Sequence, residues 1–328
     1  MTPMHPKTLV QMTLSALAAA VLAACGGGGG DAGGSLSTAN AQGYAADSAT
    51  MPVSAATAVD DSVSTLEAAL ATSASSSTDQ RPLSAQPQAI TGSVACAGGG
   101  TVAWSVSGST PALEANGQFD TGEVYAVTYN QCTASDGTTV LDGSASLTVN
   151  ARTSSTVDLT HQTSALTLTT STGQWVLNGS TRAVRSTIAT ASGGTQVTSQ
   201  LTSSGISLNS TIGTRQASYS LETLSWTVVR TYGASGQLTG RTQQGTLVLD
   251  ASTPRRPNAT LQITTNGALT IGSDGLAASG SFSVIDAHDT ITCTYGNGSL
   301  TLTLDLGNDG TIDRSWTITN TDFNSSAG

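Results

Sequence analysis

The sequence predicts an all-β fold, a large antiparallel meander that follows a flexible tether. From Ile90 onward, apolar and polar residues alternate with period two, as in the run 141–151, and such alternation is typical of half-buried strands. Turn dipeptides such as Asn297-Gly298 and Asp309-Gly310 separate these runs. Helical periodicity of useful length does not recur after residue 90, so we expect hairpins between sequence neighbours.

Further strands are expected over ten segments, many of them rich in Thr: 156–168, 174–188, 195–208, 217–230, 237–250, 260–264, 276–285, 290–295, 299–306 and 311–319. Several exceed about ten residues, whereas strands usually have five or six. Long strands joined by short turns fit a curled sheet, a half-barrel or an elongated sandwich. A transmembrane barrel has similar alternating strands, but the aromatic girdles of that class are lacking here.

Residues 1–24 are predicted to be a signal peptide. Lys7 is followed by the apolar run 9–22 and then by small residues, which is the pattern of a secretory signal. The run is too short to be a comfortable membrane span. The stretch Leu22-Ala23-Ala24-Cys25 resembles the lipobox of bacterial lipoproteins. In that family the cysteine thiol is diacylglycerol-modified, the signal is cut before it, and the new amine is acylated.

The resemblance implies lipidation of Cys25, and several acyl chains give stable membrane attachment. The alternative is an ordinary signal peptide with an incidental cysteine, but the glycine run and the long polar stretch after Cys25 favour an anchor. In enterobacterial lipoproteins an aspartate after the cysteine tends to retain the protein in the inner membrane. Gly26 stands there instead. By the same resemblance we expect the outer membrane, with the protein facing the periplasm or the surface.

Residues 25–88 read as a lipidated cysteine and a flexible tether, because Gly and small polar residues dominate them. A short helix over 59–72 is possible within it, since Val59, Val63 and Leu66 fall at helical spacing. Such a helix would dock on the folded domain or bind a partner. Residues 89–322 are expected to be the β-domain and 323–328 a C-terminal tail.

The net charge excludes one class of partner. The formal net charge is −10, and Lys7 is the only lysine. Nucleic acids and anionic lipid surfaces require basic patches, so we expect no nucleic acid partner. The expected partners are the membrane, through the lipid on Cys25, and possible envelope proteins, glycans or lipids.

Three cysteines remain besides Cys25, and an exported chain places them in an oxidising compartment. Because three is odd, at most one disulfide forms within the chain. Cys96 and Cys132 are favoured because both lie in one compact segment, which leaves Cys293 as a buried thiol in the strand 290–295. The absence of CxxC spacing and the scattered histidines give little support to a zinc site.

Two segments place side-chain oxygens at short intervals around glycines, as calcium loops do. The first holds Glu114, Asn116 and Asp120, and the second holds Asp305, Asp309 and Asp313. The second segment matches positions 1, 5 and 9 of an EF-hand loop but has Trp316 at position 12, where that loop has a glutamate. The alternative is that both segments are hairpin turns, where Asn, Asp and Gly are favoured.

Catalytic patterns are weak. Gly280-Ser281 lacks the strand–turn–helix context of a nucleophile elbow, and His288 between Asp286 and Asp289 fits either a base with an orienting acid or a solvated turn. We therefore expect a protein without enzymatic activity. The four tryptophans are expected in the core, and a sugar-stacking or lipid-binding face is the alternative for them.

Part of the β region resembles a known group. The series Cys96-Ala97-Gly98-Gly99-Gly100, Tyr129-Asn130-Gln131-Cys132 and Leu141-Asp142-Gly143-Ser144 is similar to uncharacterised β-rich lipoproteins of proteobacteria. The resemblance covers residues 90–150, names no activity, and supports pairing Cys96 with Cys132. Glu114 stands where we would expect an aspartate.

These observations favour an outer-membrane lipoprotein acting as a non-enzymatic structural or binding module of the cell envelope. One alternative is a half-barrel carrier of a lipid or another apolar ligand, which requires an uncovered apolar concave face. A wall-directed hydrolase is another, and it requires two carboxylates or a Ser/His pair converging in a cleft.

Overall fold

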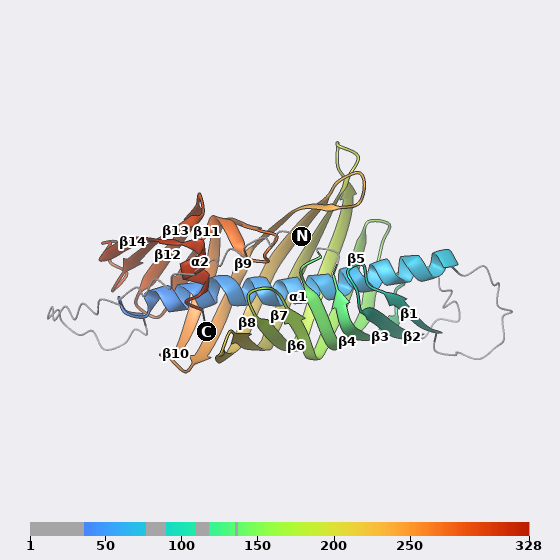
Figure 1. Ribbon diagram of the computed structural model, residues 1–328, viewed down its shortest axis with the longest axis horizontal. Coiled ribbons are helices and arrows are strands. Elements are labelled where there is room, and N and C mark those ends of the chain that lie inside the picture. Colours follow the sequence, from blue (N-terminus) through green and yellow to red (C-terminus); the bar gives the residue numbers. More distant parts are fainter. Residues whose placement is uncertain (1–35, 77–89, 109–117, 135–136, 328) are drawn as a thin grey trace, which may run out of the picture. The chain divides into compact units, whose positions relative to one another are not determined.

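The computed structural model describes residues 36–76, 90–108, 118–134 and 137–327. The predicted signal peptide, Cys25, Glu114 and Asn116 lie outside these ranges. Fourteen strands form one sheet in the order β1 to β14, and each strand pairs antiparallel with its sequence neighbours (Figure 1). The predicted all-β antiparallel meander is therefore confirmed.

The strands are longest in the middle of the sheet. Their bounds are β1 Ile90–Ala95, β2 Thr101–Gly108, β3 Glu123–Thr133, β4 Val140–Arg152, β5 Thr156–Thr169, β6 Gln174–Ala189, β7 Thr195–Ile212, β8 Arg215–Tyr232, β9 Leu238–Thr253, β10 Arg256–Ile271, β11 Ala277–Ile285, β12 Thr290–Gly296, β13 Ser299–Asp305 and β14 Arg314–Thr319. Helix α1 (Ala41–Ser76) precedes the sheet and helix α2 (Asn320–Asn324) follows it.

A line of β-bulges crosses the middle of the sheet. The pairing register shifts at Tyr129/Cys132 between β3 and β4, at Thr163/Leu166 between β5 and β6, and at Glu222/Ser225 between β8 and β9. At each shift the buried positions slip by one residue; in β8, for example, Leu221 and then Leu224 are buried. Because a bulge bends its strand, both halves of a long strand turn their apolar side chains toward the same interior.

Glycines permit this bend where one strand crosses close to the next. Gly143 has φ +107°, and a Cβ atom there would lie 2.5 Å from the carbonyl oxygen of Ala165, which itself has φ 57°. Gly245 has a similar role, since a Cβ atom would lie 2.1 Å from the carbonyl oxygen of Ser225. Side chains at these positions would push the two strands apart.

The interior of the bent sheet is filled by α1. Every residue from 43 to 63 is buried, on all faces of the helix. The helix contacts strands near both edges and in the middle of the sheet, namely β1, β2, β5–β9, β11 and β12 (Figure 1). The turns after β5 and β10 also approach each other, since the Cγ2 atom of Thr170 lies 3.8 Å from the position of a Cβ atom at Gly275. The core is therefore a helix–sheet interface.

The predicted helix over 59–72 is present as part of the longer α1, but the prediction of a flexible tether is wrong for residues 41–76. The helix begins at Ala41, well before residue 59, and it is a core element. Its alanines favour helix formation and their small side chains allow strands to approach from every side. A helix that is buried on all sides has no polar stripe. The amphipathic spacing in the sequence therefore indicated only the last turns of α1.

The C-terminal segment is also packed against the core. Phe323 in α2 and Ala327 after it are fully buried, so residues 323–327 are not a free tail. The ring of Phe323 packs against Tyr295, with ring centroids 6.1 Å apart. The Nη1 atom of Arg215 donates to the carbonyl oxygen of Ala327 at 2.9 Å, which fixes the chain end against β8.

Candidate functional site

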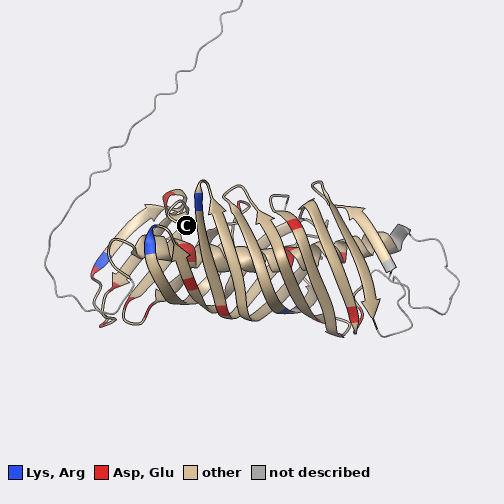
Figure 2. Cartoon of the chain, turned by 90° about the horizontal axis from the view of Figure 1, so that it is seen from below, with Lys and Arg blue, Asp and Glu red and all other residues tan. Residues whose placement is uncertain are grey.

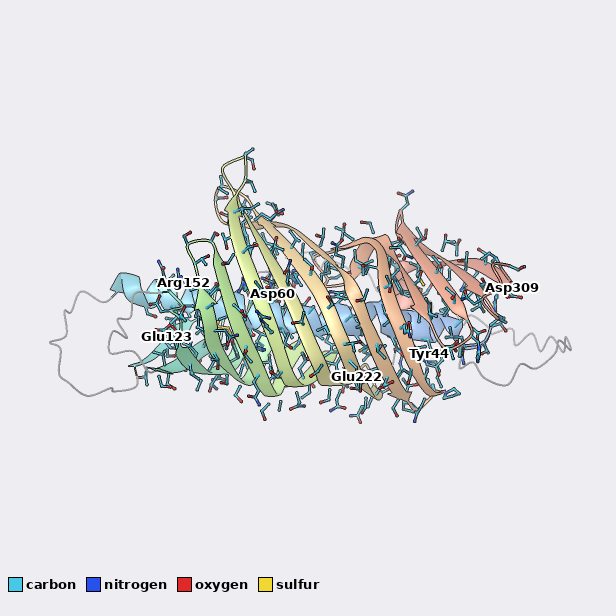
Figure 3. All side chains as sticks on the ribbon, turned by 180° about the vertical axis from the view of Figure 1, so that it is seen from behind. Tyr44, Asp60, Glu123, Arg152, Glu222 and Asp309 are labelled. Carbon is cyan, nitrogen blue, oxygen red and sulfur yellow. A yellow bond between two sulfur atoms is a disulfide. The ribbon has the colours of Figure 1, made fainter. Side chains whose placement is uncertain are left out.

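The charged side chains of greatest burial lie between α1 and the sheet. Asp60 and Asp61 of α1 face Arg230 of β8, and both carboxylates form ion pairs with its guanidinium. Arg241 of β9 lies with Nη2 3.2 Å from Oδ1 of Asp61. These four side chains are at most 5% exposed. We call them, together with Arg185 of β6, the ionic cluster; Asp60 is labelled in Figure 3.

The cluster is balanced by neighbouring polar groups. The Oγ atom of Ser199 donates to Oδ1 of Asp60 at 2.5 Å. Arg185 reaches the more exposed Glu67 at 3.1 Å and donates to Ser64 at 2.9 Å. Together with the ion pairs of Arg230 and Arg241, these contacts attach one stretch of α1 to four strands, β6 to β9.

The electrostatics agree with this geometry. Burial by itself would raise the pKa of the Asp60 carboxyl, but Arg230, and then Arg185 and Ser199, outweigh it and hold that pKa below its ordinary value. Burial opposes the charge of Arg230 as well, yet Asp60 and Asp61 keep its pKa well above the ordinary value. Asp60 and Arg230 are therefore charged in the folded protein at neutral pH.

A second ionic contact lies nearer the start of α1, where Figure 3 labels Tyr44. Asp47 pairs with Arg256 of β10 and accepts a hydrogen bond from the Tyr219 hydroxyl at 3.0 Å. The guanidinium carbon of Arg256 lies 5.2 Å from the ring centroid of Tyr44. Arg256 also donates to the carbonyl oxygen of Ser326 at 3.1 Å, so it joins α1, β10 and the C-terminal segment.

A serine and a histidine meet in the core with the separation of a nucleophile and its base. The Oγ atom of Ser62 lies 2.7 Å from Nε2 of His161, but the two residues are at most 1% exposed. Ser62 donates to the carbonyl oxygen of Val59 at 2.8 Å, so Nε2 of His161 is the donor in the contact between them. Burial lowers the pKa of His161 to about 4. A donating imidazole with no access to solvent does not serve as a general base.

The turn that contains His288 has a structural role. Oδ1 of Asp286 accepts hydrogen bonds from the backbone N–H groups of His288 and Asp289, at 2.9 and 2.8 Å. Oδ2 of the same carboxylate accepts the N–H of Leu36 at 2.9 Å. The carboxylate thus caps its own turn and binds the residues that lead into α1.

The second predicted calcium segment is a network of turns. Asp305 accepts the N–H groups of Asp309 and Gly310, at 3.2 and 3.0 Å, and Asp313 accepts the N–H of Leu306 at 2.7 Å. Nowhere in the described ranges do three His, Cys, Asp or Glu side chains gather as a metal ion requires. Oxygens of Asp305 and Asp313 thus bind backbone amides of the turns, and the calcium site at Asp305, Asp309 and Asp313 stays a prediction.

The first predicted calcium segment is described only from residue 118. Glu123, at its end, is buried and accepts hydrogen bonds from the N–H of Asp120 at 2.7 Å and from the Tyr125 hydroxyl at 2.5 Å. Burial, and then Glu123, raise the pKa of Tyr125. Glu114 and Asn116 lie outside the described residues, so their role stays a prediction.

The cysteines are placed as predicted. Cys96 and Cys132 form a disulfide that links the end of β1 to β3, with Cα atoms 5.5 Å apart. Cys293 in β12 is a buried free thiol, and burial raises its pKa. A thiol of this kind is inert.

The tryptophans give no sugar-binding platform. Trp104, Trp175 and Trp226 are buried in the core, and Nε1 of Trp226 donates to Gln243 at 2.8 Å. Trp316 is half-buried beneath Arg314, whose guanidinium carbon is 4.9 Å from the ring centroid. The core interpretation holds for the first three.

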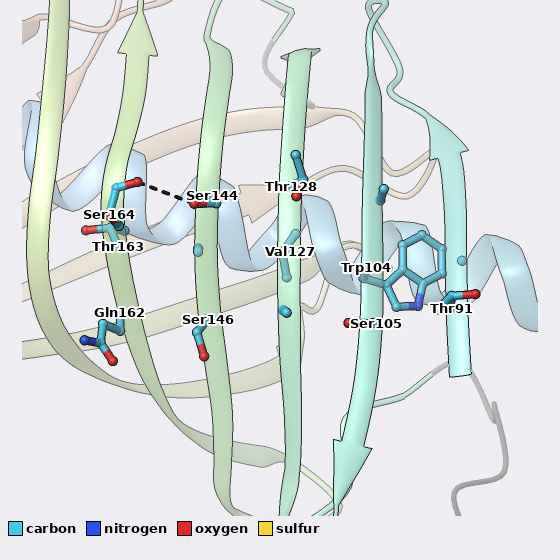
Figure 4. A pocket seen from close by; sticks show the side chains of 14 residues that line it. Thr91, Trp104, Ser105, Val127, Thr128, Ser144, Ser146, Gln162, Thr163 and Ser164 are labelled. Carbon is cyan, nitrogen blue, oxygen red and sulfur yellow. Dashed lines mark hydrogen bonds between the residues drawn. The ribbon is translucent and has the colours of Figure 1, made fainter. Parts of the chain in front are cut away.

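A shallow groove of about 600 Å³ crosses β1 to β5 on the face of the sheet opposite to α1 (Figure 4). Its lining has no charged side chain and consists of small hydroxyl and apolar residues with one glutamine: Thr91, Gly92, Ala103, Trp104, Ser105, Ala126, Val127, Thr128, Ser144, Ala145, Ser146, Gln162, Thr163 and Ser164. Trp104, Val127 and Ala145 point into the core, so mainly their backbones form the floor. The groove offers hydrogen bonds and shape, without an ionisable group.

Comparisons of the chain with the models of known families, with curated proteins and with solved structures give no match. Within the described part of the chain, no helix combines the length and the apolar character needed to cross a membrane.

The buried arginines are the residues that sequence reasoning missed. A signal for them exists in β8, where Trp226, Val228 and Arg230 occupy successive inward-facing positions. A charged residue in phase with core residues requires a buried counter-charge. Asp60-Asp61, in a segment expected to be a tether, supplies it.

Proposed function

We propose that this chain is an outer-membrane lipoprotein, anchored through Cys25, whose β-structure acts as a non-enzymatic structural or binding module of the cell envelope. The anchor rests on the lipobox-like Leu22-Ala23-Ala24-Cys25. The module rests on one observation above all: α1 fills the inside of the sheet. Contacts with envelope components then fall on the outer face, which carries few charges (Figure 2).

The outer face is a continuous array of hydroxyl groups. One row of directly paired positions runs from β2 to β14, none of them is buried, and all but Val124 and Arg182 carry a hydroxyl: Ser107, Val124, Thr148, Thr160, Arg182, Thr202, Ser225, Thr246, Thr264, Ser283, Thr292, Thr303 and Ser315. Neighbouring strands lie about 4.8 Å apart, so this row presents a hydroxyl at almost every step. Such a face suits an uncharged hydrogen-bonding partner, such as a protein or a glycan of the envelope.

The carrier alternative is less favoured. It requires an apolar concave face open to a ligand, whereas that face contacts Ala45, Val59 and other side chains of α1 that are at most 2% exposed. The hydrolase alternative requires a reactive pair in a cleft, and Ser62 and His161 are sealed in the core.

The anchor is tested by replacing Cys25 with Ser and growing the producing bacterium with a labelled fatty acid. We expect the variant to lose the acyl label and to retain its signal peptide. Cys293→Ala is the matched control, because it removes a thiol that is buried in β12, and it should be labelled normally. A Cys25→Ser chain that is processed normally and still sediments with membranes would refute the anchor.

The module is tested by native mass spectrometry of the purified full chain. We expect the mass of the processed chain with its covalent acyl groups and no other bound molecule. A copurified lipid released by mild activation would favour the carrier, and bound calcium would support a metal site in one of the two predicted segments, 114–120 or 305–313.

A further inference from the structure

The two edges of the sheet differ in how they are protected. β14 carries Arg314 at its first position, preceded by Asp313, and charges of this kind discourage further strand pairing. β1 at the other edge reads Ile-Thr-Gly-Ser-Val-Ala, with no charge, no proline and no bulge. Among the described strands it pairs only with β2. The backbone N–H and C=O groups on the side of β1 that faces away from β2 can therefore pair with another strand.

β1 is held rigidly in place. Cys96, the residue after the strand, is bonded to Cys132 in β3, two strands away. The N–H of Cys96 also donates to the carbonyl oxygen of Gly100 at 3.1 Å, which closes the β1–β2 hairpin. A strand fixed at this end loses less conformational entropy on pairing than a frayed one.

The same hydrogen bond shows which backbone groups face the open edge. Groups of alternate residues in an antiparallel strand point to opposite sides. Since those of Cys96 point to β2, those of Gly92 also do, and those of Thr91 and Ser93 point to the open edge.

We propose that a second copy of this chain pairs with β1, antiparallel and with Gly92 on the two-fold axis. Gly92 then lies opposite Gly92 of the second copy, and Thr91 lies opposite Ser93 of the second copy. The outward N–H and C=O groups of Thr91 and Ser93 are those that this register bonds. Paired residues of an antiparallel sheet share a face, so hydroxyl meets hydroxyl on the outside.

The other face of the strand fits this register at Gly92. The Trp104 indole lies over Gly92, since a Cβ atom at Gly92 would be 2.2 Å from Cζ2 of that ring. The two glycines at the axis leave no side chain between the two indoles. The pairing is isologous, the arrangement that closes a dimer.

The groove of Figure 4 also continues across this axis. It contains two rows of outer-face positions, which are Thr91–Ser105–Ala126–Ser146–Gln162 and Ser93–Ala103–Thr128–Ser144–Ser164, and all but Ser93 line it. Because Thr91 pairs with Ser93 of the second copy, each row continues as the other row in that copy. The dimer therefore has one groove of twice the length, lined mainly by hydroxyl groups with Ala103, Ala126 and Gln162 between them.

The pairing of Ile90–Val94 with the same five residues of the second copy is much smaller than the ~1,600 Å² of a typical stable interface, so association of the free chain is weak and cross-linking is the suitable measure. Full chains that carry Thr91→Cys and Ser93→Cys are purified separately in detergent, mixed and oxidised. Opposite residues have Cα atoms about 5.5 Å apart, within disulfide range. Positions two residues out of register exceed about 7 Å and are not bridged.

We expect the mixture to give a disulfide-linked dimer, and each variant by itself to give roughly a tenth as much or less. The unsubstituted chain controls for Cys25 and Cys293. Mixing Ser93→Cys with Thr317→Cys on β14 tests head-to-tail pairing of the two edges. The proposal would be overturned if the mixture of Ser93→Cys and Thr317→Cys gave as much disulfide-linked dimer as the mixture of Thr91→Cys and Ser93→Cys, or more.

A second variant tests the hydrogen bonds without a cysteine. Ser93→Pro removes an N–H that faces away from β2, so the fold is retained, whereas Ser93→Ala keeps that N–H. By sedimentation in detergent we expect dimerisation to weaken at least about tenfold in the first variant only. Equal dimerisation of two folded variants would refute this pairing.

Discussion

Replacing Arg230 with Leu tests whether the ionic cluster holds α1 inside the sheet. The substitution removes the closest cation from Asp60 and Asp61, which are at most 1% exposed. Breaking a buried ion pair on one side costs about 3–5 kcal/mol, because the two carboxylates lose their closest counter-charge while Arg185 and Arg241 remain 3.9 and 3.2 Å away. A domain is stable by about 5–15 kcal/mol, so a large part of the free energy of unfolding is lost.

Urea unfolding followed by tryptophan fluorescence measures this loss, since the buried Trp226 lies on the same strand. The matched control is Arg182→Leu. Arg182 pairs with Asp158 at 2.6 Å, but its side chain is 60% exposed. We expect a much smaller change in the control, because solvent screens an exposed pair. Equal losses for the two variants would refute the role of the cluster.

The pH dependence gives a second check with a defined sign. The pKa of Asp60 is lowered in the folded protein, so its contribution is present above the ordinary pKa of about 4 and is lost as pH falls through the folded value. Without Arg230, the partner that lowers the pKa of Asp60 most is gone, so that pKa rises. The free-energy difference between Arg230→Leu and the wild type should therefore shrink as pH falls from 7 toward 4. A difference that grows over this range would contradict the mechanism.

Two further predictions concern the bend and the edge of the sheet. Gly143→Ala should cost at least about 1 kcal/mol in the free energy of unfolding, because its φ is +107° and its Cβ atom would meet the Ala165 carbonyl oxygen, whereas Gly205→Ala, with open space around the site, should cost less. Equal urea midpoints for Gly143→Ala and Gly205→Ala would contradict the claim that the bend requires a glycine at position 143. Replacing both Cys96 and Cys132 with Ser should lower the free energy of unfolding by about 3–4 kcal/mol, because the disulfide closes a loop of 36 residues in the unfolded chain. An unchanged midpoint would show that β1 is held without it.

The sheet could be predicted from the sequence because its signals are local. Alternation and turn dipeptides lie within each strand and hairpin, and the meander joins only sequence neighbours. The bend was also present in the sequence, as one-residue slips such as His161, Thr163 and then Leu166 at buried positions. At each slip the alternation of buried and exposed positions shifts by one residue. A search for simple alternation reads the strand as continuous and does not detect this shift.

The candidate site could be predicted only in part, because it joins distant segments. The disulfide lies within one compact segment, and its pairing was predicted correctly. The ionic cluster joins Asp61 to Arg230, 169 residues further along the chain. Neither residue by itself distinguishes a solvated charge from a buried one. The Asp/Gly turns are ambiguous in the sequence, because oxygens spaced as in a calcium loop also bind amide groups in a hairpin.

The position of the charges on α1 explains how a helix buried on all sides finds one register. Its alanines and valines contact the sheet with similar groups on every face, so apolar packing discriminates weakly between neighbouring axial positions. A shift by one turn would move Asp60 and Asp61 about 5.4 Å away from Arg230, and Asp47 away from Arg256, leaving buried charges unpaired at two places. Replacing Asp60, Asp61, Arg230 and Arg241 together by neutral residues of similar size removes two charges of each sign and leaves Arg185 paired with Glu67, so it should retain much of the stability that Arg230→Leu alone loses. It should also broaden the environment of α1, which a spin label at the exposed Ala68 would report as more than one spectral component. A single component in a fully stable variant that lacks these four charges would show that packing alone sets the register.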